Sequence, residues 1–570
     1  MSSEEVATCL RVLQALGADR TLFVDVSEGD RKALLEAASR LTSPTDEEER
    51  NLRRAFRRKE KRMQRAQDAA AIAKAGVRAQ RRAIAAAVGA VSPAALVAPV
   101  MGALPLPAGP VPASPLSVSL AQGARAPTEG PEAEELQTAR NCYVCKAPYR
   151  RVHPFYDSMC CACGDFNYQK RTQTADLRGR VALMTGSRLK IGYEATLMLL
   201  RAGATVIATT RFPVDSAKRY AREHDFEEFR DRLHVHGLDL RHTPSVELFA
   251  RFLTTRFSRL DYLINNAAQT VRRPPGFYAH LLADEERGLE AVPAHGHLLL
   301  AGHMQVQAAL QQGLATAGPS ALSRGDRHGA HDGPEAHGVD GTGALALGSG
   351  ERAPLAVLDG WQRPAPGMGL WASARLSQIP YSLEDASLSD DVFPVGALDN
   401  DRQQVDLRTM NSWRMRLSDV PTPELIEVHL VNTIAPFVLC SKLKPLMLAE
   451  NTRDRHVVNV SAMEGQFNRG TKTDKHPHTN MAKAALNMLT RTSASDYARD
   501  GIYMNSVDTG WVTDEDPAAH VARKIADHGF EPPLDIVDGA ARIVDPIFHG
   551  ANTGEFFSGK FLKDYRPTEW

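Results

Sequence analysis

The fold is decided by residues 181–192, which read VALMTGSRLKIG. The run starts as a short apolar and β-branched strand, turns at Gly186, and reaches Gly192 where an amphipathic helix is expected to begin. Glycine at these two positions lets the backbone turn tightly and approach a diphosphate, which would rest on the N-terminus of the helix. The stretch therefore predicts a strand, a turn and a helix that bind a nucleotide.

Short strand patterns of the same kind recur along the chain and alternate with amphipathic stretches. They cover residues 205–209, 233–238, 262–265, 456–460 and 502–507. Strands that alternate with helices form right-handed βαβ units around a parallel sheet. We therefore predict an α/β fold, a doubly wound parallel sheet of the Rossmann type over residues 176–570, with its ligand at the carboxyl ends of the strands.

Four cysteines upstream of this sheet have a spacing close to that of a zinc ribbon. Cys142 and Cys145 form one CxxC pair, Cys160 and Cys163 form another, and fourteen residues separate the pairs. Two such knuckles place four thiolates around one Zn²⁺ ion, which supplies much of the folding energy of a short segment. We predict a structural zinc ribbon over residues 141–171, although Cys161 leaves the ligand set open to a one-residue exchange.

Three further segments differ in composition from the sheet and the ribbon. Residues 1–90 show helical periodicity, and their basic run at 52–65 is interpreted as a solvated helix face rather than a nucleic-acid site. Residues 91–140 are rich in Pro and Ala and are predicted to form a flexible linker. A second low-complexity stretch at about 284–366 is predicted to be a disordered insertion in the nucleotide-binding domain.

Charge and cysteine content restrict the partners and the compartment. Lys plus Arg and Asp plus Glu each number 68, so net charge gives no argument for nucleic acid or an anionic membrane. The chain starts without a basic leader, and no membrane-spanning run stands out in its sequence. Paired CxxC cysteines favour a reducing compartment. We therefore expect a cytoplasmic protein without a membrane partner, for which nucleic acid is an unfavoured ligand.

Beyond the first turn, several motifs resemble those of the short-chain dehydrogenase/reductase family. Residues 185–192 match its TGxxxGxG turn, except that Lys190 replaces the middle glycine, as in pteridine-reductase-like members. Asn265 and Ala267 belong to an NNAA run similar to the family's NNAG, and Asp239 resembles its adenine-binding acid. The resemblance covers residues 176–283 and about 400–570. It also extends to an atypical subgroup with a cysteine knuckle before the fold, for which no substrate is defined.

The resemblance implies a nicotinamide dinucleotide as the cofactor, a small-molecule substrate, and pairing of subunits into a homo-oligomer. An acid at the end of the second strand would favour NAD, but this chain has Arg211 there, with Arg188 and Lys190 in the nearby turn. Arginine and lysine pair well with a 2'-phosphate, so NADP(H) is predicted. The predicted cofactor-binding residues are Thr185, Gly186, Arg188, Lys190, Ile191, Gly192, Arg211, Asp239, Asn265, Ala267 and Lys483.

The catalytic motif departs from the family's pattern. Lys483 and Asn432 resemble the lysine and the helix asparagine of its catalytic tetrad. Thr479 stands where the family has its tyrosine and Ala462 where it has its serine, while Ser461 comes one residue early and is expected to face the other way. An imidazole titrates near neutral pH, so His478 or Thr479 is the candidate proton donor. The predicted catalytic residues are Lys483, Asn432, His478 and Thr479.

Two functions follow from these observations. The first is an NADP(H)-dependent oxidoreductase with an altered proton donor, acting on a carbonyl or alcohol whose identity the sequence does not give. The second is a catalytically silent nucleotide-binding scaffold or regulator that contacts a protein partner through the ribbon and the N-terminal helices. The missing tyrosine and serine favour the second, and the retained Lys483 and Asn432 favour the first.

Overall fold

The computed structural model describes residues 2–88, 134–316, 367–380, 385, 391–399, 401, 403–470 and 472–570. The chain forms two compact units, one of Met1–Ala71 with Glu135–Thr138 and one of Ile72–Glu134 with Ala139–Trp570. Most of the predicted linker, residues 91–133, lies outside the described residues.

The N-terminal region is helical. Its elements are α1 (Ser3–Ala18), η1 (Arg20–Asp25), α2 (Glu28–Thr42), α3 (Asp46–Ala73) and α4 (Gly76–Val88). Ser2 and Glu5 form a capping box at the start of α1, and the Ser27 side chain accepts a hydrogen bond from a backbone N–H in the first turn of α2. The basic run at 52–65 lies on α3 with nearly all of its side chains exposed.

The second unit contains the predicted parallel sheet, which confirms the fold class. Its strand order is β10-β9-β8-β7-β6-β3-β4-β5, and all neighbours are parallel except β10 and β9. The strands are β3 (Val181–Thr185), β4 (Thr205–Thr210), β5 (Leu233–Gly237), β6 (Tyr262–Asn265), β7 (Arg455–Ser461), β8 (Ile502–Asp508), β9 (Phe561–Lys563) and β10 (Arg566–Thr568). The order runs outward from β3 in both directions, which creates a crevice at the carboxyl ends of β3 and β6.

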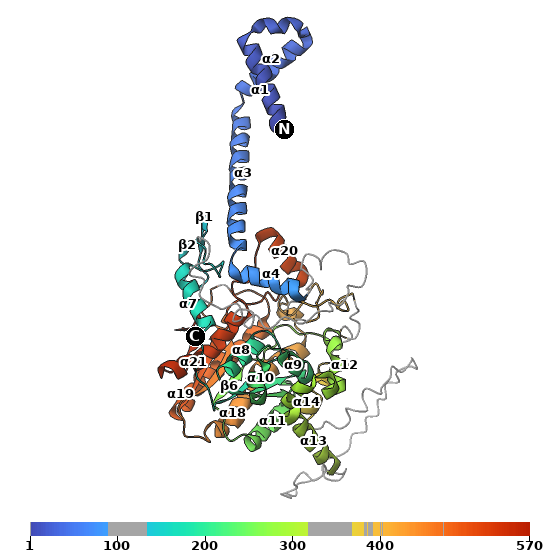
Figure 1. The fold of residues 1–570 in the computed structure, drawn as a ribbon, viewed down its shortest axis with the longest axis vertical. Helices are drawn as coiled ribbons and strands as arrows, with labels where there is room; N and C mark the ends of the chain where they lie inside the picture. Colours follow the sequence, from blue (N-terminus) through green and yellow to red (C-terminus); the bar gives the residue numbers. More distant parts are fainter. Residues whose placement is uncertain are drawn as a thin grey trace, which may run out of the picture. The chain divides into compact units, whose positions relative to one another are not determined.

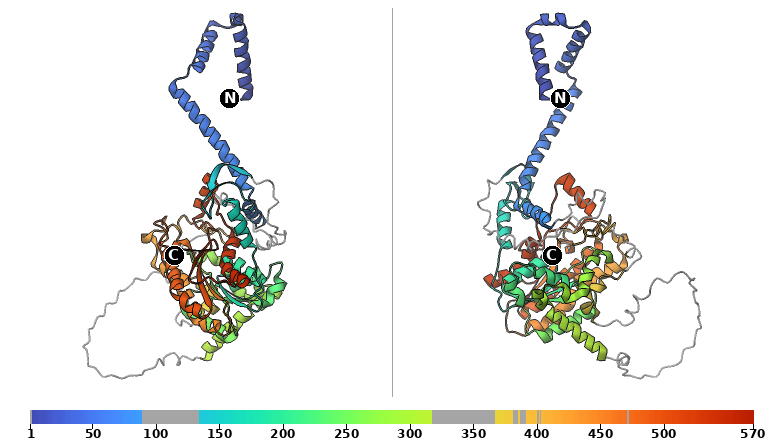
Figure 2. Two further views of the ribbon diagram at one scale, coloured as in Figure 1. Left: turned by 90° about the vertical axis from the view of Figure 1, so that its left-hand side faces the viewer. Right: turned by 45° about the vertical axis from the view of Figure 1, so that its right-hand side comes forward.

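Helices cover both faces of this sheet (Figures 1 and 2). On one face α8 (Lys190–Arg201) packs against α21 (Ile536–Thr553), and on the other α11 (Thr243–Arg256) packs against α18 (Ala435–Met447). Each face has its own apolar core. The long α19 (Pro477–Arg499) packs on β8 and carries Lys483.

Shorter elements connect these layers. They are α9 (Pro213–Tyr220), α10 (Phe226–Phe229), η2 (Arg230–Arg232), η3 (Pro275–Tyr278), α14 (Met368–Trp371), α15 (Ser373–Leu376), η8 (Leu417–Asp419), α17 (Thr422–His429), η9 (Leu430–Ile434), η10 (Met463–Gly465) and α20 (Ala518–His528). Residues 422–447 are long and apolar enough to cross a membrane by composition alone, but half of the apolar window is buried in the fold. Core helices of soluble proteins share these properties, so this is weak evidence for a membrane span.

The predicted insertion begins later than its composition indicates. Residues 279–316 form α12 (Ala279–Arg287), η4 (Gly288–Ala291), η5 (Ala294–Leu300) and α13 (Ala301–Thr316). Leu299 and Leu300 are buried in one sheet core and Val306 in the other, so the domain continues through this segment. The prediction of disorder from 284 was wrong up to 316 because a few well-placed apolar side chains suffice to anchor a helix. Residues 317–366 lie outside the described residues.

The cysteine segment is bound to the sheet domain. It contains β1 (Glu135–Asn141), β2 (Pro148–Arg151) and α7 (Cys161–Arg171). The Tyr156 hydroxyl donates to Asp538 at 2.6 Å, and Lys170 pairs with Asp545 at 2.7 Å. Both acids lie on α21, so the ribbon packs on the last long helix of the fold.

Candidate active site

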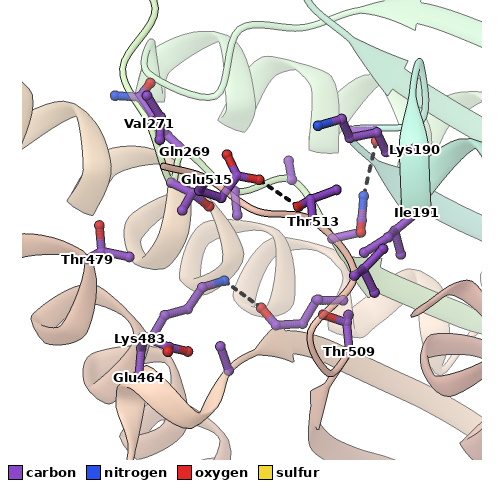
Figure 3. A pocket seen from close by; sticks show the side chains of 18 of the residues that line it. Lys190, Ile191, Gln269, Val271, Glu464, Thr479, Lys483, Thr509, Thr513 and Glu515 are labelled. Atoms are coloured by element: carbon purple, nitrogen blue, oxygen red, sulfur yellow. Dashed lines mark hydrogen bonds between the residues drawn. The ribbon is translucent and has the colours of Figure 1, made fainter. Parts of the chain in front are cut away.

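A cavity of about 1090 Å³ lies at the carboxyl ends of the central strands. It is lined at these strand ends by Gly186, Thr209, Asn266, Ser461 and Asp508. Figure 3 shows how Lys190 and Ile191 from one side, and Thr479 and Lys483 from the other, surround the same space. This is the position expected for the ligand of a doubly wound sheet.

The turn after β3 forms a cradle that only glycine allows. Gly186 has φ +68°, and a Cβ there would lie 2.8 Å from the Cα of Ala267. A Cβ on Gly192 would lie 2.1 Å from the Gly186 carbonyl oxygen. The Asn266 amide donates to the Thr185 and Gly186 carbonyls at 2.9 and 3.0 Å, which fixes the turn. Lys190, Ile191 and Gly192 in the first turn of α8 line the cavity, and first-turn N–H groups have no partner within their own helix, which suits diphosphate binding.

Lys190 occupies the strained position of this turn. Its φ is +52°, in the left-handed region that glycine adopts more readily. Its side chain lines the cavity, and its ammonium lies 3.6 Å from the Asp401 carboxylate. Ile191, Gly192 and Ala267 line the same wall. Residues with a strained backbone conformation cluster at functional sites, and at this one the side chain is a cation.

Arg211 lies at the end of the cavity where β4 ends. Its guanidinium donates to the Tyr278 hydroxyl at 2.6 Å and stacks 4.7 Å from the centre of that ring. Arg188 also lines the cavity, but it is buried and pairs with Asp215 at 2.8 Å. Asp239 faces the same end and is held by Arg241 at 2.6 Å. Arg211 is thus the better placed of the two arginines to bind an anion.

Two predicted cofactor-binding residues do not line the cavity. The Thr185 hydroxyl accepts the backbone N–H groups of Asn266 and Ala267, each at 3.0 Å, and so ties β3 to the end of β6. The Asn265 amide donates to Asn459 at 2.8 Å, which joins β6 to β7. Both side chains are buried in the sheet, so their role is to hold the strand ends that line the cavity.

Lys483 and Thr479 face the cavity from α19 (Figure 3). The Lys483 ammonium donates to the Val460 carbonyl at 2.7 Å, and burial lowers its pKa to about 8. The Thr479 hydroxyl is buried and has no hydrogen-bond partner among the described residues. The two residues are one helical turn apart and therefore share a face. A hydroxyl and a lysine with a pKa of about 8 thus line the same cavity.

His478 does not line the cavity, so the structure gives no support to its predicted role as proton donor. Its imidazole is buried, and Nε2 lies 3.5 Å from a carboxylate oxygen of Glu424 on α17. Adjacent helical residues are turned by about 100°, so His478 cannot share the face of Thr479 and Lys483. His476 lines the cavity instead and stacks on Trp413, with ring centres 3.9 Å apart.

Asn432 does not line the cavity but holds a residue that does. It lies in the π-helical turn η9, where its Oδ1 accepts the Gln269 N–H at 2.7 Å and its Nδ2 donates to the Gln269 carbonyl at 3.2 Å. Gln269 lines the cavity, whereas Asn432 is buried behind it. π-helical turns are frequent at functional sites, and this one fixes the loop after β6.

Ser461 and Asp508 line the cavity, although neither was predicted to belong to the site. Ser461 was expected to face away, but it lines the cavity, and its buried hydroxyl has no hydrogen-bond partner in the described part of the chain. Asp508, opposite Ser461 in the sheet register, lines it too, and burial raises the pKa of its carboxyl to about 6. An acid at the end of a buried strand was the available signal for Asp508.

The four predicted metal ligands cluster beside the cavity. The sulfur atoms of Cys142, Cys145, Cys160 and Cys163 all lie within 4.8 Å of one another. Cys145 Sγ and Cys160 Sγ are 3.8 Å apart, which matches the edge of a tetrahedron built on Zn–S bonds of about 2.3 Å. Cys161 Sγ instead faces the Arg151 carbonyl, so the one-residue exchange is not needed. The donor set fits Zn²⁺ with no open position.

We expect Cys145→Ser to lose the metal and Cys161→Ser to keep it. Structural zinc supplies folding energy to a segment this short, so the ribbon should lose its order in the first variant. Zinc content of the purified full chains, measured by mass spectrometry, and thiol reactivity test this. Equal zinc in wild type, Cys145→Ser and Cys161→Ser would contradict the assignment.

Two family models match the sheet domain in succession. The model described as short chain dehydrogenase matches residues 180–286, and the one described as enoyl-(acyl carrier protein) reductase matches residues 409–529. The chain belongs to the short-chain dehydrogenase/reductase family. The two matches flank the segment that the sequence analysis set apart.

Individual relatives align over very different lengths. The chain is 28% identical over 422 residues to an uncharacterized protein of Acanthamoeba polyphaga mimivirus, covering 72% of this chain and 71% of the viral protein. It is 33% identical to (+)-neomenthol dehydrogenase of Capsicum annuum, but over only 15% of this chain and 28% of the plant enzyme. The solved structure of NADPH-bound carbonyl reductase from chicken fatty liver aligns with 69% of the chain and all of the reductase, at 15% identity and a TM-score of 0.36.

Three positions of this site differ from the family motifs that the sequence resembles. Lys190 stands in the glycine-rich turn, Thr479 stands four residues before the lysine, and Ala462 follows Ser461 at the end of β7. Lys483 keeps its place on the cavity-facing side of α19. The cradle at Gly186 and Gly192 and the cation at Arg211 fit a dinucleotide, and α19 presents a threonine to the cavity four residues before Lys483.

Proposed function

We propose that the chain is an NADP(H)-dependent oxidoreductase that interconverts a small-molecule carbonyl and alcohol. The observation that carries this proposal is a single cavity with a glycine cradle and Arg211 at one end and Lys483, Thr479 and Asp508 at the other. That arrangement suits a dinucleotide laid across the strand ends, with its reactive ring at the groups that exchange protons.

Each end of the cavity has its own task. The turn at Gly186 and the start of α8 would hold the diphosphate, and Arg211 would pair with the 2'-phosphate. NADPH supplies the hydride when it is bound. Gln269, held by Asn432, lines the wall between the two ends and keeps the loop after β6 in place.

The proton is assigned to acids and bases other than a phenol. Lys483 and Asp508 have pKa values of about 8 and about 6, so both can exchange a proton near neutral pH. An aliphatic hydroxyl is too weak an acid for this, but the buried Thr479 and Ser461 hydroxyls lack partners and can bind a substrate oxygen. We therefore assign proton exchange to Asp508 with Lys483, and substrate orientation to Thr479 and Ser461.

A catalytically silent nucleotide-binding protein is the second candidate. The replacements at Thr479 and Ala462 favour it, since the family's phenol and serine are both missing. It would bind NADPH as the first candidate does but would not turn over. Hydride transfer to a panel of ketones and aldehydes, compared in wild type and Asp508→Asn, separates the two.

The cofactor assignment is tested by titrating the purified chain with NADPH and NADH and following nicotinamide fluorescence. Wild type should bind NADPH more tightly, and Arg211→Ala should lose about 10- to 100-fold of that affinity because a charge-assisted bond to phosphate is removed. NADH binding should not change, and Arg251→Ala, an exposed arginine on α11, should match wild type. Absence of binding by a folded sample would refute the proposal, and an equal loss for both nucleotides would refute the role of Arg211.

A further inference from the structure

The cysteine ribbon forms part of the cavity wall. Tyr143 and Lys146, both within the first knuckle, line the cavity together with Asp508 and Trp511. Tyr143 lies between the two metal-ligand positions Cys142 and Cys145. A structural metal site and a catalytic cavity thus share one short loop of chain.

Tyr143 holds the segment that follows β8. Its hydroxyl accepts the Trp511 backbone N–H at 3.0 Å. Gly510 has φ +75°, and a Cβ there would lie 3.2 Å from the same hydroxyl, so the phenol packs directly on the backbone. The Lys563 ammonium lies 5.7 Å from the centre of the Tyr143 ring. The tyrosine therefore holds the backbone at Gly510 and Trp511, just after Asp508.

The knuckle that presents Tyr143 is itself fixed at two sides. The Cys142 N–H donates to the Ala147 carbonyl at 2.9 Å, and the Tyr143 N–H donates to the Ser158 carbonyl at 2.8 Å. Behind it, Tyr156 and Lys170 bind α21. The four cysteine sulfurs close this loop, so its shape depends on the bond that joins them.

Tyr143 acts at one end of the cavity only. Arg211 and Asp239 follow β4 and β5, on one side of β3, whereas Trp511 follows β8, on the other. In a doubly wound sheet these two sides take the two halves of a dinucleotide. The adenosine half would meet Arg211, and the nicotinamide half would meet the segment that Tyr143 holds.

We propose that the metal-loaded knuckle positions Tyr143 to build the nicotinamide end of the cavity, so that metal loading controls cofactor binding. This inference rests on the proposed function. Without the metal, the loop at Tyr143 loosens and the backbone at Gly510 and Trp511 loses its outer support, while the adenosine end stays formed. Tyr143 is a positioning residue in this scheme.

The test uses the full chain and two probes, NADPH and 2',5'-ADP, which carries only the adenosine half. Tyr143→Ala should weaken NADPH binding about tenfold and leave 2',5'-ADP binding unchanged, and Tyr143→Phe should weaken NADPH binding by roughly threefold. Tyr149→Phe is the matched control, because its hydroxyl donates to the Asp157 carbonyl at 2.7 Å within the ribbon and does not line the cavity. It should bind both probes as wild type does.

Metal removal completes the test. Chelator-treated wild type should match Tyr143→Ala in its NADPH affinity, and chelator treatment of Tyr143→Ala should add little. Unchanged 2',5'-ADP binding shows in each case that the sheet domain is folded. Tyr143 variants that bind NADPH like wild type, or a loss of equal size for both probes, would overturn the inference alone. A wild type that binds 2',5'-ADP but not NADPH, or neither probe, would overturn the proposed function with it.

Discussion

Gly192→Ala should reduce NADPH affinity by about 100-fold and lower the thermal stability of the sheet domain. The added Cβ would meet the Gly186 carbonyl oxygen at 2.1 Å and the Asn266 amide nitrogen at 2.4 Å. These atoms belong to the cradle itself, so relief requires the turn or the start of α8 to move. Overpacking of this kind costs about 1–3 kcal/mol, and losing two helix-terminal bonds to phosphate would account for the affinity.

Gly470→Ala is the control for this substitution, because a Cβ there would meet nothing within 4 Å. NADPH titration and thermal unfolding of both variants give the comparison. Wild-type affinity in Gly192→Ala would mean that the cavity binds its ligand without the glycine turn, and the dinucleotide assignment would fail.

Arg171→Met should destabilise the protein by about 3–5 kcal/mol. Arg171 is only 1% exposed and is the last residue of α7, and it pairs with Asp535 at 2.5 Å and with Asp538 at 3.1 Å at the start of α21. Phe155 covers the guanidinium at 4.8 Å. Removing the cation leaves two carboxylates buried at the start of α21 without their counter-charge, which costs far more than the loss of one surface ion pair.

Arg178→Met provides the contrast within the same chain. Arg178 pairs with Asp176 at 2.5 Å, but their side chains are 82% and 61% exposed, so this pair should contribute no measurable stability. Thermal unfolding followed by circular dichroism compares the two variants. Similar unfolding temperatures for Arg171→Met and wild type would show that the ribbon and α21 are not held together by the buried pair.

The sheet could be predicted because parallel strands buried on both faces leave continuous apolar runs such as residues 181–185 and 456–460. The cysteine cluster could be predicted because two CxxC pairs at this separation are typical of a metal site. The helices at 288–316 were missed because the low-complexity stretch was extended back to about residue 284, although Leu299, Leu300 and Val306 anchor this segment in the core.

The site was harder to predict than the fold. The choice between His478 and Thr479 depends on which helix face meets the cavity, and the spacing to Lys483 contained that information. Thr185 and Asn265 are buried and connect neighbouring strands by hydrogen bonds. These partners are distant in the sequence, so the sequence alone did not show this role. The contribution of Tyr143 to the cavity wall depends on its hydrogen bond with Trp511, 368 residues further along the chain, and no local sequence pattern indicates such a contact.

The packing of the ribbon on α21 also has a consequence for biosynthesis. Lys170 and its partner Asp545 are 375 residues apart. A ribosome that adds about 5–20 residues per second separates their synthesis by roughly 20–75 s. During that interval the nascent ribbon lacks α21 as its docking surface. On the zinc assignment proposed above, the supply of zinc during translation would decide whether the knuckle is already formed when α21 emerges.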